Sequence, residues 1–181
     1  MGKRSEAERG GTRVGSSRWL EEFEEFARAG SPRMLRTAVL LSGDWHLAED
    51  LVQSTLAKVY AAWGKVRRAD SPEAYARTVL IRTYISHVRL RRTGERPVAE
   101  IPQAPTEQPD PTVRIALFAA LAQLSAQDRA VVVLRYWLDR SVEDTAAALR
   151  VSPGAVRNRS MRALIKLRGL LGGDHELFVA H

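Results

Sequence analysis

Residues Arg140–Leu171 read RSVEDTAAALRVSPGAVRNRSMRALIKLRGLL, and this stretch predicts two helices joined by a tight turn. Ser141 can cap a short helix over residues 142–149, because a serine side chain accepts a hydrogen bond from a free backbone N–H group at a helix start. Ser152 and Pro153 then suit the cap and the first position of a second, longer helix. The pattern is typical of a helix-turn-helix unit.

The second helix of this unit has two different faces. Small or apolar residues recur at three- and four-residue steps, as the buried side of a helix requires, at Val156, Ser160, Leu164, Leu167 and Leu171. The opposite face carries Arg157, Asn158, Met161, Arg162 and Lys166. Because the second helix of such a unit enters the major groove of DNA, a basic outer face indicates DNA binding. A plain helical hairpin whose basic face is only solvated is the alternative.

The composition of the whole chain favours an anionic partner. The 181 residues carry a net charge of +7 and an isoelectric point near 10.3, which suits nucleic acid better than an acidic small substrate. No apolar run approaches the roughly 20 residues that a membrane span needs. The N-terminal stretch MGKRSEAERGGTRVGSS lacks the apolar core of a signal peptide, so we expect a cytoplasmic protein.

Side chains for catalysis or metal binding are scarce. The chain has no cysteine, which excludes disulfides, thiolate metal sites and a thiol nucleophile. The four histidines are scattered without metal-ligand spacing. Paired carboxylates in a plausible cleft, a Ser/His/Asp set and a phosphate-binding loop are also missing. We therefore expect no cofactor, no metal and no enzymatic activity.

Helical patterns cover most of the chain and no stretch carries a strong strand signal, so the predicted fold is all-α. The polar composition of residues 1–17 predicts a disordered extension. The expected helices span about 19–30, 31–43, 45–63, 72–92, 112–124, 126–138, 142–149 and 153–171, followed by a tail over 172–181. They form two small helical domains, residues 18–92 and 112–171.

Residues 93–111 form a proline-rich, acidic linker between these domains. Its five prolines exclude a continuous helix, and four acidic residues against one arginine give it a net charge of −3. Fully extended, the linker would reach about 60 Å, far more than two touching domains need. The interpretation therefore depends on two domains that can act apart, and a single rigid globule would contradict it.

Three stretches together resemble an extracytoplasmic-function (group 4) sigma factor of bacterial RNA polymerase, in the sigma-70 family. LAEDLVQSTLAKVYAAW (Leu47–Trp63) is similar to region 2.2 of that family, and SPEAYARTVLIRTYISHVRLRR (Ser71–Arg92) to region 2.4. The stretch Leu121–Arg168 resembles region 4. The resemblance covers about four fifths of the chain, and the details TAVLLSGDWHLAEDLVQ and RAVVVLRYW are similar to the actinobacterial SigE-like subgroup.

The resemblance implies three binding surfaces. A surface for the clamp helices of the largest polymerase subunit would contain Asp50, Gln53, Ser54 and Lys58. A surface for the melted non-template strand of the −10 element needs a cationic track with aromatic stacking, and would contain Lys65, Arg67, Arg68, Tyr75, Arg77 and Arg82. A surface for the −35 element as duplex would contain Ser152, Arg157, Asn158, Met161, Arg162 and Lys166.

The implied activity is that of a dissociable promoter-specificity subunit, associated with the nucleoid. The implied partners are core polymerase, through its clamp helices and flap region, promoter DNA and an anti-sigma factor. Three departures from the family pattern keep the promoter sequence open. Arg150 stands where the turn usually has glycine, Ala155 replaces a hydroxyl residue that often touches a phosphate, and Arg82 with His87 and Val88 replaces an asparagine and aromatics.

Two other classes of function stay open on the residues alone. A stand-alone helix-turn-helix regulator would bind a duplex operator without any other protein, usually as a symmetric dimer. A helical adaptor or antagonist would act only through contacts with other proteins.

Overall fold

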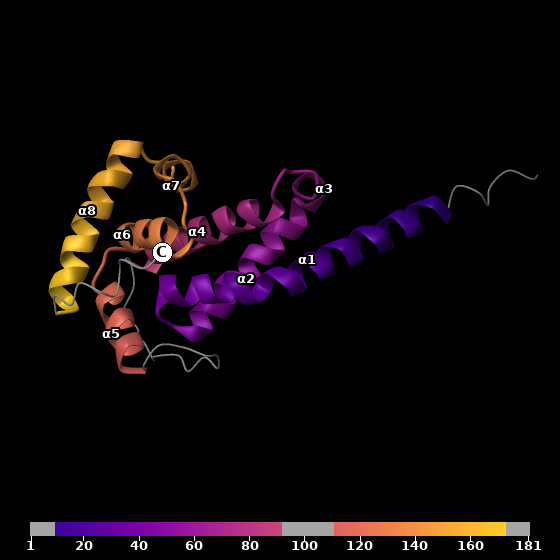
Figure 1. The fold of residues 1–181 in the computed structure, drawn as a ribbon. Coiled ribbons are helices and arrows are strands. Elements are labelled where there is room, and N and C mark those ends of the chain that lie inside the picture. The colour runs from indigo at the N-terminus through magenta and orange to yellow at the C-terminus, as the bar shows by residue number, and fades with distance from the viewer. Residues whose placement is uncertain (1–9, 92–110, 173–181) are drawn as a thin grey trace, which may run out of the picture.

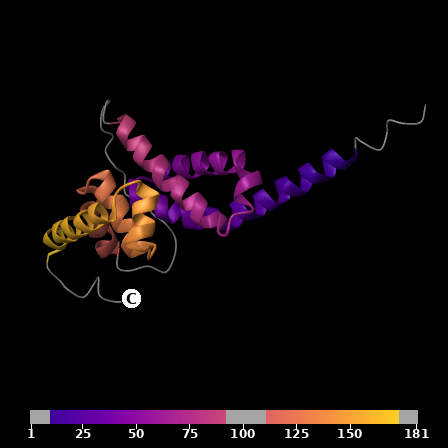
Figure 2. The same ribbon diagram turned by 90° about the horizontal axis from the view of Figure 1, so that it is seen from above.

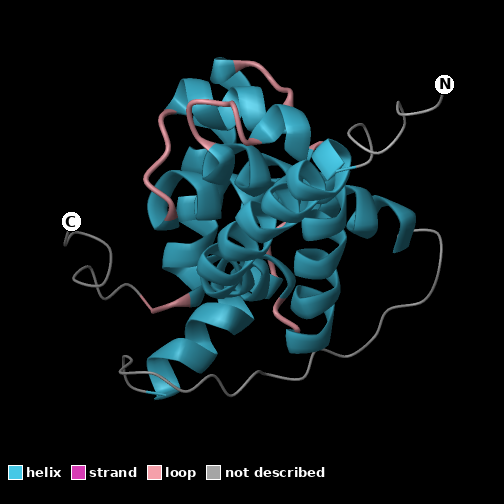
Figure 3. Cartoon of the chain, turned by 90° about the vertical axis from the view of Figure 1, so that its right-hand side faces the viewer, coloured by secondary structure: helices cyan, strands magenta, loops and turns pink. Residues whose placement is uncertain are grey.

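The computed structural model describes residues 10–91 and 111–172, and nearly all of this part is helical, without a strand (Figure 3). The predicted all-α fold is therefore confirmed. The helices of the first domain are α1 (Gly10–Ser42), α2 (Trp45–Ala61), α3 (Trp63–Val66) and α4 (Pro72–Arg91). The second domain contains α5 (Pro111–Ala122), α6 (Ala126–Val132), the π-helix η1 (Val133–Trp137), α7 (Val142–Leu149) and α8 (Pro153–Leu170). The linker and the C-terminal tail fall almost entirely outside the described residues.

Helix α1 differs from the prediction in two ways. The sequence predicted two helices separated at Gly30–Pro32, whereas the structure has one helix with Pro32 inside it. Pro32 removes one backbone hydrogen bond and its ring crowds the preceding turn, but the packing of α1 along α2 offsets this cost. The Ser31 hydroxyl also donates to the carbonyl of Ala27 at 2.5 Å. Residues 10–17 were expected to be disordered but extend α1, since each added residue lengthens a helix that already exists.

An aromatic cluster fixes α1 to the end of α2 and the start of α3. Phe23 of α1 lies edge-on to Tyr60 at 4.9 Å between ring centroids and to Trp63 at 5.4 Å. Trp19 meets Tyr60 at 4.8 Å, and Phe26 meets Trp63 at 4.9 Å. These geometries are favourable for aromatic pairs, so the cluster supports the loop that follows α3.

The helix caps of the second domain follow the sequence closely. The Ser141 side chain accepts a hydrogen bond from the Asp144 N–H at 2.9 Å, and Ser152 accepts one from the Ala155 N–H at 3.1 Å. Helix α7 covers residues 142–149 as predicted, and α8 begins at Pro153. Ser125 caps α6 in the same way, through the Asp128 N–H. The predicted helix-turn-helix unit is therefore present.

The two domains pack against each other. The helices of the second domain gather at the end of the first domain where α1 finishes, while the N-terminal part of α1 projects from the opposite end (Figures 1 and 2). One cluster of buried apolar side chains runs through both domains, from Leu41 and Leu80 in the first to Leu134 and Leu167 in the second. The sequence predicted the two helical sets, but it gave no sign of a contact between them.

Candidate nucleic-acid interface

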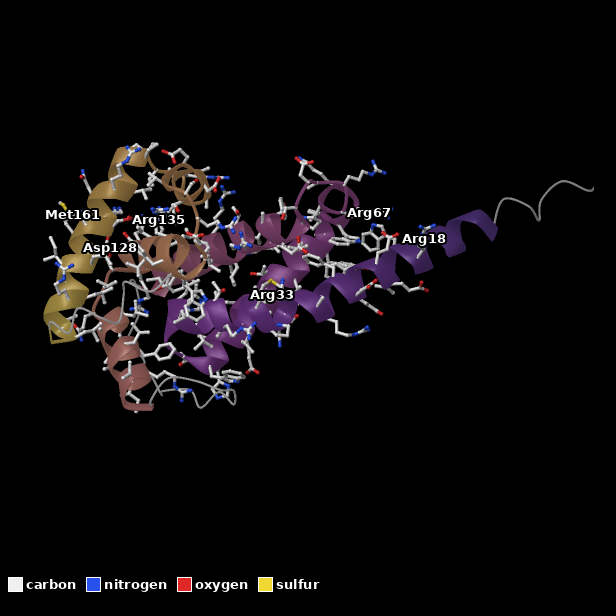
Figure 4. All side chains as sticks on the ribbon, viewed as in Figure 1. Arg18, Arg33, Arg67, Asp128, Arg135 and Met161 are labelled. Carbon is white, nitrogen blue, oxygen red and sulfur yellow. The ribbon has the colours of Figure 1, made fainter. Side chains whose placement is uncertain are left out.

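Helix α8 presents the predicted polar face to solvent. Its inner side, with Val156, Ser160 and Leu167, is buried against the rest of the domain. Its outer side carries exposed side chains, namely Arg157, Asn158, Met161 and Arg162. The Met161 side chain is 58% exposed and points away from the other helices (Figure 4). The N-terminal half of α8 thus has the shape and chemistry of a helix that reads base edges in a major groove.

The turn between α7 and α8 passes through a left-handed residue. Arg150 has a φ of 57° and a ψ of 48°, and its N–H donates to the carbonyl of Ala146. This is the position at which helix ends favour glycine, because a side chain there costs about 1 kcal/mol. The sequence departure at Arg150 therefore corresponds to a strained residue in the motif.

Two of the α8 residues that were predicted to contact DNA, Arg157 and Lys166, also interact with other residues of the same domain. Arg157 forms an ion pair with Glu143 of α7 at 3.3 Å, and both side chains are exposed. The ammonium of Lys166 donates to the carbonyl of Gln123 at 2.6 Å, just after the end of α5. Lys166 is therefore directed towards α5, whereas Arg157 lies between α7 and the outer face of α8.

A further ion pair, which sequence reasoning missed, joins α8 to α6. Arg159 meets Asp128 at 2.8 Å, and Asp128 also accepts a hydrogen bond from the Ser125 hydroxyl at 2.6 Å. Burial alone would raise the pKa of Asp128, but the hydrogen bonds from Ser125 and Arg159 and the charges of Arg159 and Arg162 outweigh it and lower the pKa. The Ser125–Asp128 spacing was a recognisable capping pattern, but nothing in the sequence indicated Arg159 as the partner.

The six residues predicted for the −10 element lie in two different environments. Lys65, Arg67, Arg68 and Tyr75 are exposed around α3, the loop after it and the start of α4. Arg67 also forms an ion pair with Glu22 of α1 at 3.0 Å, beside the aromatic cluster (Figure 4). Arg77 and Arg82 lie further along α4, are half-buried and face the second domain. The structure thus brings four of the six together.

The environments of Arg77 and Arg82 are set by the contact between domains. Burial lowers the pKa of Arg77, the charge of Arg140 lowers it further, and Glu73 opposes both effects. Arg77 also lines a hollow of about 430 Å³ between α1, α4 and Leu138 of the second domain. Arg82 donates hydrogen bonds to two carbonyls of α7.

The residues predicted to contact core polymerase share one side of α2. Asp50, Gln53, Ser54 and Lys58 are all exposed, while Leu51, Val52 and Val59 face the core of the domain. The ammonium of Lys58 donates to the hydroxyl of Thr83 on α4 at 2.8 Å. Helix α2 therefore offers a continuous polar stripe, with Lys58 directed towards α4.

No metal-binding arrangement is found in the part of the chain that the structure describes, since no group of three His, Cys, Asp or Glu side chains is suitably placed. Within the same ranges, no helix is both long and apolar enough to cross a membrane.

Comparison with known proteins agrees with this geometry. Residues 26–93 match the profile of Sigma-70 region 2, and residues 114–167 match that of Sigma-70, region 4. The RNA polymerase sigma-E factor of Streptomyces coelicolor is 39% identical over 151 residues, covering 81% of this chain and 84% of that protein. The RNA polymerase sigma factor CarQ of Myxococcus xanthus is 30% identical over 165 residues, covering 88% of this chain and 94% of the relative.

A solved structure has a similar fold. The sigma factor RpoE from Bartonella quintana, in complex with the anti-sigma factor NepR, superimposes with a TM-score of 0.72 at 26% identity. The match covers 85% of this chain and 99% of the other.

Proposed function

This chain belongs to the extracytoplasmic-function sigma factors of bacterial RNA polymerase. We propose that different helices of the chain bind the −35 element, the −10 element and core polymerase. The protein directs core polymerase to promoters and has no enzymatic activity of its own. Its partners are core polymerase and promoter DNA. We place its action in the cytoplasm, on the nucleoid.

Helix α8 reads the −35 element as duplex DNA. The observation that carries this assignment is the exposed outer face of α8, where Arg157, Asn158 and Met161 stand free of the domain core. Arginine and asparagine side chains can form paired hydrogen bonds to base edges, and a methionine can contact a thymine methyl group. Ser152 and Arg162 flank this face and suit contacts to the phosphate backbone.

The loop after α3 and the start of α4 hold the melted −10 element. Lys65 and Arg68 are exposed, and among the described residues neither has an ion-pair partner. The Tyr75 side chain is 40% exposed on the first turn of α4 and offers a stacking surface. A cationic track beside an aromatic ring is the usual arrangement for a single strand. Arg67 contributes once its contact with Glu22 is released.

The polar stripe of α2 faces the clamp helices of core polymerase. Asp50, Gln53 and Ser54 lie together on an exposed side of a helix whose other side is buried. We further propose an anti-sigma factor as a regulatory partner, because the RpoE structure with the similar fold is a complex with one.

Run-off transcription tests this function. Promoters are first identified by mapping the transcription starts that depend on this chain, and are then transcribed with purified core polymerase. The full chain should direct initiation at those starts, core alone should not, and Arg157→Ala should reduce it. Arg168→Ala, an exposed arginine in the last turn of the same helix, serves as the matched control. No promoter-dependent product with cognate core would overturn the proposal.

A further inference from the structure

The outer face of α8 carries a row of apolar residues that continues beyond the predicted DNA contacts. Met161, Ile165 and Gly169 recur at four-residue steps, so they lie along one side of the helix, the side that faces away from the domain. Met161 is 58% exposed and Ile165 is 61% exposed. A Cβ atom added at Gly169 would meet nothing within 4 Å, so the row is open at its end. These three residues form an apolar strip about 12 Å long.

DNA reading accounts for only one end of the apolar strip. Base contacts of a helix-turn-helix unit come from the N-terminal residues of its second helix, and Met161 follows Arg157 and Asn158 there. Ile165 and Gly169 lie further along α8. Among the described residues, no other helix packs over this side of α8 (Figures 1 and 4). Because the burial of apolar surface is favourable, this end of the strip suits a further segment of chain.

The chain turns back at the end of α8. The helix ends at Leu170, and Gly172 has a φ of 80°, the left-handed conformation with which many helices terminate. The C-terminal tail, residues 173–181, follows this turn with the sequence GDHELFVAH. Gly169 is one turn of helix before Gly172. The tail therefore begins next to the end of the apolar strip.

The length of the tail suits the apolar strip. Met161 precedes Gly172 by eleven residues, which is about 16 Å of helix. Leu177 follows Gly172 by five residues, and an extended chain of that length also spans about 16 Å. A tail that returns along α8 thus brings Leu177 and Phe178 to the level of Ile165 and Met161.

The charges of the tail and of the strip are complementary. Arg162 and Lys166 are exposed, and each follows a residue of the strip, so they form a basic edge along it. The tail contains Asp174 and Glu176, has no lysine or arginine, and continues with the apolar residues 177–179. An acidic start followed by an apolar run matches an apolar strip with a basic edge.

We propose that the tail docks antiparallel on the outer face of α8, with Leu177 and Phe178 against Ile165 and Met161. The docked tail covers part of the face that reads the −35 element, so it competes with duplex DNA. The docking is a property of the free chain alone. The competition with DNA rests on the function proposed above.

Thiol reactivity of the free chain tests the docking. The chain has no cysteine, and Gly169→Cys places one thiol under the path of the tail, where the structure has room for it. A maleimide should modify this thiol several-fold more slowly in the full chain than in a chain that ends at Gly173. Combined Leu177→Ser and Phe178→Ser substitutions in the full chain should raise the rate to that of the shortened chain. Glu24→Cys, an exposed control site on α1, should react equally in both chains.

The outcomes distinguish docking within one chain from the alternatives. Circular dichroism checks that the shortened and substituted chains retain their helices. The protection should be independent of protein concentration, because the tail belongs to the chain that it covers. Protection that grows with concentration would show a contact between two copies and would overturn the proposal. Equal rates in the full and shortened chains would also overturn it, even if transcription succeeds.

Binding of the holoenzyme to a duplex that carries the −35 element measures the competition. Removal of the tail should tighten this binding several-fold, and the combined Leu177→Ser and Phe178→Ser substitutions should have a similar effect. An affinity that stays the same in a chain whose thiol is protected would refute the competition. A protected thiol in a chain that supports no promoter-dependent transcription would overturn only the proposed function.

Discussion

Arg150 is the residue at which sequence and structure agree in most detail. The sequence identified it as a side chain where helix-turn-helix units favour glycine, and the structure gives it a φ of 57°. This agreement was possible because the strain is local, set by a short turn whose caps are visible in the sequence. Arg82 is the opposite case, because its partners Ala147 and Ala148 are more than 60 residues away and no local pattern connects them.

Arg150→Gly should stabilise the protein by about 1 kcal/mol, because glycine adopts the left-handed conformation without the steric cost of a side chain. The free energy of unfolding from urea titration measures the change. Arg168→Gly is the matched control, because Arg168 lies in the right-handed helix α8. This substitution should destabilise the protein by about 1 kcal/mol. Equal destabilisation by both substitutions would contradict the structural role of Arg150.

Arg157→Ala should weaken promoter binding by about 1–3 kcal/mol and relax the preference at a single base pair of the −35 element. The reason is that a bidentate arginine contact to a guanine edge is specific to one position. Binding of the complete holoenzyme to a set of single-base variants, measured by fluorescence anisotropy, checks this. A loss that is uniform across all variants would mark Arg157 as a phosphate contact instead.

At the level of elements, the boundaries with capping residues were predictable and those without them were not. Ser141 and Ser152 fixed the starts of α7 and α8, because their side chains satisfy backbone groups that any helix start exposes. The break predicted at Pro32 is wrong, since the packing of α1 along α2 outweighs the cost of a proline inside the helix. The start of α1 at Gly10 was also missed. The polar composition of residues 10–17 does not indicate a helix, and these residues are helical as a continuation of the helix that follows them.

The ion pair between Asp128 of α6 and Arg159 of α8 predicts how the stability of the protein depends on pH. The pKa of Asp128 is lower in the folded protein than in the unfolded chain, so its contribution to stability is fully present above the unfolded pKa of about 3.9. That contribution is lost as the pH falls through the lower folded value. Asp128→Asn should therefore cost about 1 kcal/mol at pH 7, the scale of a partly exposed ion pair.

Urea unfolding of parent and Asp128→Asn chains at several pH values checks this expectation. The difference in free energy of unfolding between the two chains should be constant from neutral pH down to about 5. It should disappear below the pKa of Asp128 in the folded protein. Glu143→Gln, which removes the more exposed ion pair with Arg157, is the control and should have a smaller effect on stability. A difference for Asp128→Asn that grows as the pH falls would have the wrong sign.

At the scale of the whole molecule, the sequence predicted two basic helical modules able to act apart, whereas the structure shows them packed together. Composition and patterning predict each module, whereas the contact between the modules combines a shared cluster of buried apolar side chains with hydrogen bonds from Arg82 and Arg129. No local sequence pattern indicates this contact, because the groups that form it lie far apart along the chain.

Footprinting of promoter DNA, with and without core polymerase, tests the central claim most directly. Hydroxyl-radical protection reports duplex contacts, and permanganate reactivity of thymines reports melting. With core polymerase, the full chain should protect the −35 element and open the DNA at the −10 element in the same complex. The chain alone should do neither at the same concentration. Protection of a symmetric duplex site by the chain alone, without any melting when core is added, would contradict the account.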